Sequence, residues 1–431
     1  MTSSLKVTPT QLQLQLIFMT VSTADVPPVD MSPIVRDYLL LGLRFDRLED
    51  GFVDAYTGDP ALRRSVENAP TPVPQDLAVE ARRILAALPS SGLAPRRQEF
   101  IASHVRALEC SARKFAGEDV GFIDEVDAYF DVRIELADEE TYRQAHRDIS
   151  ALMPGSGDLG DRMRSHRMGE ELPPERLNDC VDAFAGALRE RVRNQFGLPV
   201  QEQVSFEVVT DKPWSGFNYY LGDFKSTVAI NADLRQHTSS LPHLIAHEAY
   251  PGHHTEHCHK DLSLVAPGEA EHTIFLVNTP QCLMAEGLAD LALGAVVGPG
   301  WGVWAQEIYA DLGIRFDGER AERVAAATAG LLTVRQDAAI LLHDRGRSAD
   351  EVAEFLQRWL LLTPQRARQT LKFLTSPLWR AYVTTYVEGY QLLKAWLEQG
   401  PDTPDAAAER FTRLLDEPLI PSQLRRDLTR A

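Results

Sequence analysis

The spacing of apolar residues predicts helices along most of the 431 residues of this chain. Apolar side chains recur at intervals of three and four residues, which places them on one face of an α-helix. The segments with this spacing are 33–50, 76–88, 96–115, 175–195, 280–297, 301–312, 318–343, 349–360, 364–374 and 378–398. The pattern therefore predicts an all-α, mainly helical fold.

Only two segments alternate apolar and polar residues as β-strands do, namely VSFEVVT at 204–210 and STVAIN at 226–231. The expected β element is therefore small and antiparallel. We expect STVAIN to be an edge strand, whose free backbone groups would pair with an extended peptide. Stretches rich in glycine, proline and polar residues at 154–157 and 213–224 predict loops.

The length of the chain permits one large domain or two ordinary ones. No repeat or low-complexity linker divides the sequence. We expect residues 1–31 to form an extended or disordered N-terminal segment and residues 32–431 to form one helical domain. A sub-lobe boundary near 153–173 is the alternative to a long loop at that place.

Charge and composition favour a cytoplasmic protein. The net charge of −18 argues against nucleic acid or an anionic membrane as a partner, because both would repel it. No run of apolar residues approaches the length of a transmembrane span. The apolar stretch near the N-terminus is short and interrupted by glutamine, which argues against a signal peptide. Four cysteines are too few for a disulfide scaffold.

The strongest chemical signal is HEAYPGHH at 247–254. Zinc prefers imidazole and carboxylate ligands, and a catalytic zinc site keeps three protein ligands and one open position for water. The usual helical motif is HExxH, in which the glutamate beside the first ligand takes the proton of that water. This pattern predicts His247 as a ligand and Glu248 as the general base. The position four residues after His247, however, is Pro251.

The second ligand depends on how the chain accommodates this proline. A helix cannot continue undisturbed through Pro251 and Gly252. If the two residues form a bulge, His253 occupies the place that the second histidine of HExxH would hold. If the helix only kinks, His254 returns to the face of His247 but lies about 10.5 Å further along the axis. The first arrangement favours His253, and His254 remains the alternative.

Glu286, in the segment AEGLAD at 285–290, is the expected third ligand, contributed by a facing helix. It lies in a largely apolar stretch, where an unpaired carboxylate is costly. Its alternative is a solvated helix charge. Asp290, one turn further on, is a candidate acceptor for the hydrogen bond of a ligand histidine.

Other residues near the motif also have the spacing or the chemistry of metal ligands. Two further histidine pairs lie four residues apart, and two cysteines flank the segment as alternative thiolate ligands. A partly exposed helix histidine, or a small buried apolar side chain, is the structural explanation for each. The histidine pairs are His243 with His247 and His253 with His257, and the cysteines are Cys258 and Cys282. His259 and His272 are further histidines near the motif with the same two interpretations.

The motif resembles that of a bacterial family of uncharacterised domains, usually numbered 885, whose members carry HE-x-x-PGHH and then EGWA. Leu288 stands here in place of the family's tryptophan. The segments 37–58, 226–231, 337–356 and 376–389 also resemble parts of that family, so the resemblance covers the chain from about residue 35 onward.

The resemblance implies a fold similar to the carboxypeptidase Taq group, which are largely helical zinc peptidases with a deep cleft. Aligning the Gly-His of those relatives with Gly252-His253 leaves a two-residue insertion in this chain relative to HExxH. The resemblance therefore also favours His253 as the second ligand. In the resembling peptidases a tyrosine or histidine of the C-terminal helices stabilises the oxyanion. Tyr386 is the first candidate for that role and His343 the second, with core packing as the alternative for each.

These observations predict a zinc-dependent hydrolase, of carboxypeptidase or oligopeptidase type, with Zn²⁺ as cofactor and short peptides as substrates. A hydrolase of a small non-peptide amide, or a catalytically silent binding protein, remains an alternative. Arg380, Lys225 and Arg335 are candidates for binding a substrate carboxylate. Neither nucleic acid nor a membrane is expected as a partner.

Overall fold

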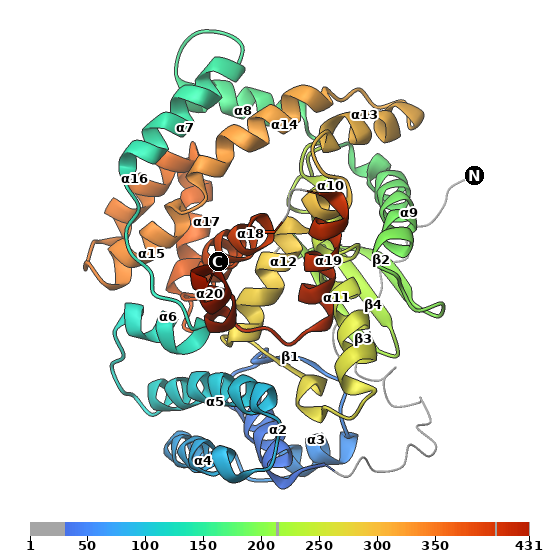
Figure 1. Cartoon of the computed structure of the whole chain (residues 1–431). Coiled ribbons are helices and arrows are strands. Elements are labelled where there is room, and N and C mark those ends of the chain that lie inside the picture. Colours follow the sequence, from blue (N-terminus) through green and yellow to red (C-terminus); the bar gives the residue numbers. More distant parts are fainter. Residues whose placement is uncertain (1–30, 213–214, 401–402, 431) are drawn as a thin grey trace.

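The structure is a computed structural model, and it describes residues 31–212, 215–400 and 403–430. Figure 1 shows a mainly helical molecule with small β elements on one side, which confirms the expected fold class. Of the expected N-terminal segment 1–31, all but Met31 lies outside the described residues.

The N-terminal helices form one end of the molecule and pack around a core of their own (Figure 1). Residues 270–277 and Ile420 also contribute to this core. The helices of this end are α2 (Pro33–Phe45), α3 (Pro60–Glu67), α4 (Pro74–Ala87) and α5 (Pro95–Phe115).

The remaining helices surround a second, larger core. Buried apolar residues from both sides of the 153–173 segment belong to it. These helices are α6 (Phe122–Phe130), α7 (Glu139–Leu152), α8 (Leu159–Gly169), α9 (Leu177–Gln195), α13 (Trp301–Asp311), α14 (Gly318–Thr328), α15 (Val334–His343), α16 (Ala349–Leu360), α17 (Pro364–Thr375), α18 (Tyr390–Glu398), α19 (Pro404–Asp416) and α20 (Pro421–Arg430).

Three helices in the middle of the molecule carry the two ends of the HEAYPGHH segment and the AEGLAD segment (Figure 1). They are α10 (Leu241–Glu248), α11 (His253–Lys260) and α12 (Pro280–Val296). Residues 280–289 at the start of α12 are all buried, as expected of a helix that is apolar on every side and surrounded by other elements. Helix α12 packs against α10, against α18 and against the π-helical turn η7 (Thr385–Gly389).

The larger sheet has the strand order β2-β4-β3. Strand β2 (Gln203–Val209) runs parallel to β4 (Lys225–Asn231), and β3 (Gly216–Gly222) runs antiparallel to it. The prediction that STVAIN forms an edge strand is therefore wrong, because β4 pairs on both sides. The prediction of a loop over 213–224 is also wrong for Gly216–Gly222, since pairing with β4 outweighs the local turn preference of the glycine and asparagine residues there.

A second sheet, which the sequence did not predict, joins β1 (Val53–Tyr56) to β5 (Ile274–Leu276) in antiparallel pairing. Strand β5 ends four residues before the start of α12. The N-terminal end of the molecule is thereby attached to the central helix.

One predicted helix, 318–343, is divided into α14 and α15 by the 3₁₀ turn Ala329–Leu331. Gly330 lies in this turn, and a Cβ atom there would stand 2.9 Å from the Cβ of Ala145 on α7. The whole stretch Gly318–His343 is long and apolar enough to cross a membrane by length and composition alone. Its two helices pack against α7 and α16, as core helices do.

Candidate metal centre

A two-residue bulge separates α10 from α11. The backbone N–H of Gly252 donates to the carbonyl of Ala246 at 2.8 Å, and that of Thr255 donates to Ala249 at 3.2 Å. Each bond spans six residues, two more than in an α-helix. Gly252 has no substitute here, because a Cβ atom would stand 1.8 Å from the carbonyl oxygen of His247. A bulge at Pro251 and Gly252 is the arrangement for which the sequence predicts His253 as the second ligand.

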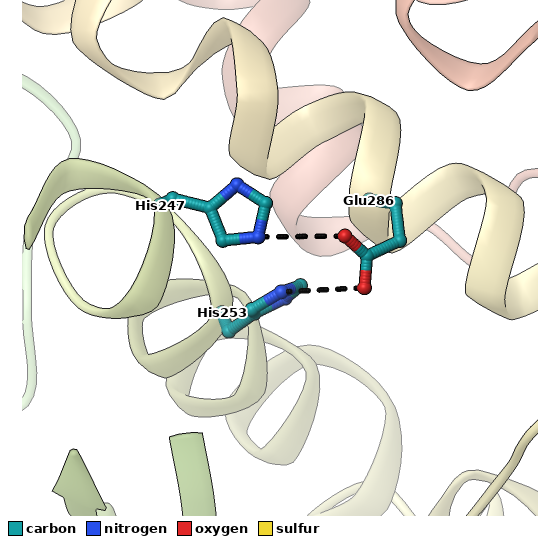
Figure 2. Close-up of side chains that lie close together, drawn as sticks. All are labelled: His247, His253 and Glu286. Carbon is teal, nitrogen blue, oxygen red and sulfur yellow. Dashed lines mark ion pairs between the residues drawn. The ribbon is translucent and has the colours of Figure 1, made fainter. Parts of the chain in front are cut away.

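The bulge turns the side chains of His247 and His253 toward Glu286 on α12 (Figure 2). The distance from His247 Nε2 to Glu286 Oε2 is 3.4 Å, and that from His253 Nε2 to Glu286 Oε1 is 3.7 Å. One ligand atom of each residue lies within 4.8 Å of the other two. Tetrahedral zinc with bonds of about 2.0–2.1 Å places neighbouring ligand atoms about 3.4 Å apart. The three side chains therefore fit a shared zinc ion.

His254 points away from this group. Its Nδ1 is hydrogen-bonded to Ser226 Oγ at 2.8 Å, and its Nε2 lies 3.3 Å from Glu202 Oε2. The ring is completely buried. The structure thus places His253, and not His254, beside His247 and Glu286.

The other histidines and cysteines of this region have structural surroundings. The ring of His243 packs against Trp301 at a centroid distance of 4.5 Å, and that of His257 stacks on Tyr220 at 4.4 Å. His259 is hydrogen-bonded to Asp416, while His272 lies beside Glu269. The thiols of Cys258 and Cys282 are buried, and burial raises the pKa of both.

The described residues contain one further group of three potential ligands, Glu269, Glu271 and His272. Arg96 and Arg97 form ion pairs with the two glutamates. The negative charge that would attract a cation is therefore already neutralised.

His247, His253 and Glu286 are called the cluster below, and hydrogen bonds orient two of these three residues. His247 Nδ1 is bonded to Asp290 Oδ1 at 3.0 Å, so Nε2 is the nitrogen that faces Glu286. The Tyr382 hydroxyl donates to Glu286 Oε1 at 2.6 Å. Glu286 Oε2 is buried and accepts no hydrogen bond from the described residues. A buried carboxylate oxygen without a donor is expected where a cation binds.

The charges of the cluster depend on one another. Burial lowers the pKa of His247, but the Asp290 and Glu286 carboxylates outweigh burial and raise it well above its usual value. Burial raises the pKa of Glu286, and the two imidazoles outweigh it and hold that pKa below its usual range. Burial lowers the pKa of His253, so this ring favours the neutral form that ligates metals.

Glu248 is buried directly beside the cluster. Burial and the neighbouring Glu286 carboxylate raise its pKa to about 7, although His247 acts in the opposite direction. Strand β3 packs closely against it, since Asn218 donates to its backbone carbonyl at 2.7 Å and a Cβ atom on Gly216 would stand 3.0 Å from Oε1. A carboxylate with this pKa can exchange a proton near neutral pH.

The two candidate oxyanion donors lie in different surroundings. Tyr386, on η7, interacts electrostatically with Glu286, Asp290 and Glu248. Its hydroxyl makes no hydrogen bond with the described residues. His343 instead is bonded through Nε2 to the Leu374 carbonyl at 2.7 Å. The structure therefore places Tyr386 near the cluster, whereas His343 interacts with residues outside it.

The candidates for binding a substrate carboxylate differ in the same way. Arg380 forms an ion pair with the buried Glu125. Lys225 is exposed at the start of β4. Arg335, on α15, is the one of the three that interacts electrostatically with residues near the cluster, namely Tyr386 and Asp290.

Sequence reasoning missed Tyr382 and Asp54, which the structure also places at the cluster. Tyr382 precedes Tyr386 by one helical turn, so the pairing of two tyrosines at this spacing was an available signal. Asp54, on β1, interacts electrostatically with Glu286. Only its position in the segment 37–58, which resembles the uncharacterised family, singled it out in the sequence.

Two cavities of about 600 and 430 Å³ lie elsewhere. The larger is bounded by α8 and the segment before α14, and the smaller by α4 and α5. Neither includes a residue of the cluster, so the deep cleft that the resemblance implied stays a prediction.

A scan with protein-family models finds no match to this chain. A search of curated proteins finds no match either. The resemblance to the uncharacterised family and to helical zinc peptidases therefore stays a prediction.

Among solved structures, the chain is similar to a protein from Colwellia psychrerythraea described as a "putative lipoprotein". The TM-score is 0.51 at 14% identity, over 86% of this chain and 69% of that chain. A protein from Shewanella oneidensis, described as a "putative lipoprotein of unknown function", aligns over 92% of this chain and 82% of that chain, with a TM-score of 0.49 and 14% identity. At this identity the first likeness concerns the fold alone.

Proposed function

We propose that this protein is a zinc-dependent hydrolase that cleaves short peptides. The observation that carries the proposal is the convergence of His247, His253 and Glu286 at ligand distances from two helix ends and a central helix. Asp290 orients the first histidine, and Glu248 stands beside it. Three potential metal ligands, an orienting group and a candidate base would together suit hydrolysis better than a purely structural site.

A zinc ion held by the three residues would polarise the scissile carbonyl and acidify the attacking water. Glu248, adjacent to the ligand His247 and buried, would take the proton of that water and pass it to the leaving amine.

Tyr386 would donate a hydrogen bond to the oxyanion. The hydroxyl of the neighbouring Tyr382 already donates a hydrogen bond to Glu286 Oε1, so it would serve the ligand and not the substrate. Burial and the surrounding carboxylates raise the pKa of Tyr386 well above its usual value, which keeps its hydroxyl protonated. A donor aimed at charge that develops during the reaction lowers the barrier without tightening substrate binding.

The test is a digest of a library of short peptides by the purified full-length chain, with zinc content measured on the same sample. We expect about one zinc per chain, peptide cleavage, and loss of cleavage after chelation that returning zinc restores. Zinc-loaded protein that cleaves no peptide would refute the proposed function.

A further inference from the structure

The larger cavity, of about 600 Å³, lies between α8 and the segment that leads into α14. Figure 1 shows these two helices at the end of the molecule remote from α2–α5. The cavity shares no residue with the cluster. A cavity of this size suits a small organic molecule. Arginine and carboxylate side chains both line it, so their pairing decides which charge it offers to a ligand.

Three arginines line this cavity, and none of them forms an ion pair with a described carboxylate. Arg162 donates only to neutral oxygens, namely the carbonyls of Ser150 and Met153 and the Ser150 hydroxyl. The guanidinium groups of Arg315 and Arg320 have no hydrogen bond or ion pair among the described residues. The Nε–H of Arg320 is also shielded from solvent. A buried donor without an acceptor is costly, unless a ligand supplies the acceptor.

Two of the three carboxylates of the cavity have other partners. Asp161 forms an ion pair with Arg164, which does not line the cavity. Asp317 caps the N-terminus of α14, where its Oδ1 accepts from the backbone N–H of Arg320 at 3.1 Å. Neither carboxylate pairs with a guanidinium group of the cavity.

Glu170, the third carboxylate, is also engaged. Its Oε2 accepts from Ser239 Oγ at 2.6 Å, and its Oε1 lies 3.4 Å from His166 Nε2. The positive charges of Arg315 and Arg320 therefore have no partner in this part of the described chain. Arginine presents a planar fork of donors that matches the oxygens of a carboxylate or a phosphate.

The remaining residues of the cavity wall indicate what kind of anion fits. Ser156 and Ser165 contribute hydroxyl groups, and neither hydroxyl has a hydrogen-bond partner among the described residues. Phe316 contributes an apolar ring, which packs against Tyr309 at a centroid distance of 5.2 Å. A phosphate monoester has about two negative charges at pH 7 and three strong acceptor oxygens. It therefore matches two arginine forks and two hydroxyls better than a single carboxylate does.

We propose that this cavity binds a small phosphate monoester, with Arg315 and Arg320 on the phosphate and Phe316 against the organic part. This site goes beyond the proposed hydrolase function, because it is separate from the cluster. The net charge of the chain is −18, so the molecular surface as a whole does not attract anions. Binding of a phosphate monoester therefore depends on the local arginines.

The test is calorimetry on the full-length chain with phenyl phosphate as the probe. Phenyl sulfate, which has a similar shape but one negative charge, and phthalate, which has two carboxylates, are the matched comparisons. We expect phenyl phosphate to bind at least about tenfold tighter than either. Absence of binding would overturn the proposal, and so would equally tight binding of phenyl sulfate or phthalate.

Variants of the two arginines locate the binding. Arg315→Gln and Arg320→Gln should each weaken the binding of phenyl phosphate by about 10- to 100-fold, because each removes a charged fork. Thermal stability without the probe should change little, since neither guanidinium group has a partner in the described protein. Arg320→Lys keeps the charge and should retain part of the affinity. Arg323→Gln removes an exposed charge from the same helix, α14, and should leave the affinity unchanged.

The same measurements distinguish the cavity from the cluster, where a bound zinc ion would also attract a phosphate. Binding at the cavity should survive chelation and weaken in Arg315→Gln and Arg320→Gln. Binding that chelation abolishes, or that both variants leave unchanged, would overturn the proposal. A chain that binds phenyl phosphate in the expected way but cleaves no peptide would refute only the hydrolase function, because this test measures binding alone.

Discussion

The imidazole of His247 and the carboxylate of Asp290 are joined by a 3.0 Å hydrogen bond that connects α10 to α12. With Nδ1 directed at Asp290, Nε2 faces Glu286, four residues earlier on the same helix, and loss of the Nε2 proton would free its lone pair for a metal. One helix thus supplies both a ligand and the group that orients another ligand. This arrangement explains why the two carboxylates occur one turn apart.

Asp290→Ala should weaken zinc binding by about 10- to 100-fold, because the ring of His247 loses the acceptor that fixes its orientation and tautomer. Competition with a chelating dye measures the zinc dissociation constant. Asp311→Ala, which removes an exposed carboxylate at the end of α13, is the matched control. Unchanged affinity in Asp290→Ala would show that the hydrogen bond does not support the metal site.

The two adjacent histidines of the motif should respond differently to the same change. His253→Gln should lower zinc occupancy, whereas His254→Gln should keep the zinc and lower the thermal stability, since it disturbs the buried contacts with Ser226 and Glu202. Removing one partner of such a buried pair costs about 1–3 kcal/mol. Zinc analysis and thermal unfolding separate the outcomes. Loss of zinc in His254→Gln alone would reverse the assignment of the second ligand.

Gly252→Ala should disrupt the bulge, because its Cβ atom would stand 1.8 Å from the backbone oxygen of His247. We expect lower stability together with lower zinc occupancy. Gly294→Ala provides a sharp control, since a Cβ atom there meets nothing within 4 Å and alanine favours the interior of α12. Normal zinc occupancy and stability in Gly252→Ala would mean that the backbone at the bulge can relax.

The local part of the site could be predicted from the sequence. Pro251 and Gly252 are incompatible with a continuous helix, so a bulge and its consequence for His253 followed from backbone chemistry alone. The apolar surroundings of Glu286 likewise indicated a buried carboxylate that needs a partner. The helical fold class followed from the spacing of apolar residues.

The remaining features depend on contacts between distant segments. Strand β3 is a strand because it pairs with β4, and β1 because it pairs with β5, more than 200 residues away. The same pairing carries Asp54 to the cluster. Such pairings leave little trace in local propensity, because strand formation depends strongly on tertiary context.

The roles of Glu248 and Glu286 should separate on substitution. Glu248→Gln removes the base and keeps the shape, so peptide hydrolysis should fall by about two to four orders of magnitude with zinc content near that of the wild type. Glu286→Gln should lower zinc occupancy itself. Both quantities come from one preparation, by elemental analysis and steady-state kinetics. A loss of zinc from Glu248→Gln as large as that from Glu286→Gln would contradict this division.

Tyr386→Phe tests the oxyanion donor. The change removes one hydroxyl that has no hydrogen-bond partner among the described residues, so folding should be unaffected. Losing a donor aimed at developing charge costs about 3 kcal/mol, or about a hundredfold in kcat, while KM should change little because that charge exists only in the transition state. Steady-state kinetics on a cleaved peptide measure both constants.

Tyr382→Phe is the comparison that gives the Tyr386 result its meaning. Its hydroxyl donates to Glu286 at 2.6 Å, so its loss should change zinc affinity more than the turnover of zinc-saturated protein. If Tyr386→Phe leaves kcat unchanged, Tyr386 is a packing residue. If both tyrosine variants lower zinc affinity equally and leave saturated turnover unchanged, the two hydroxyls belong to the ligand's surroundings, and the oxyanion donor is another group.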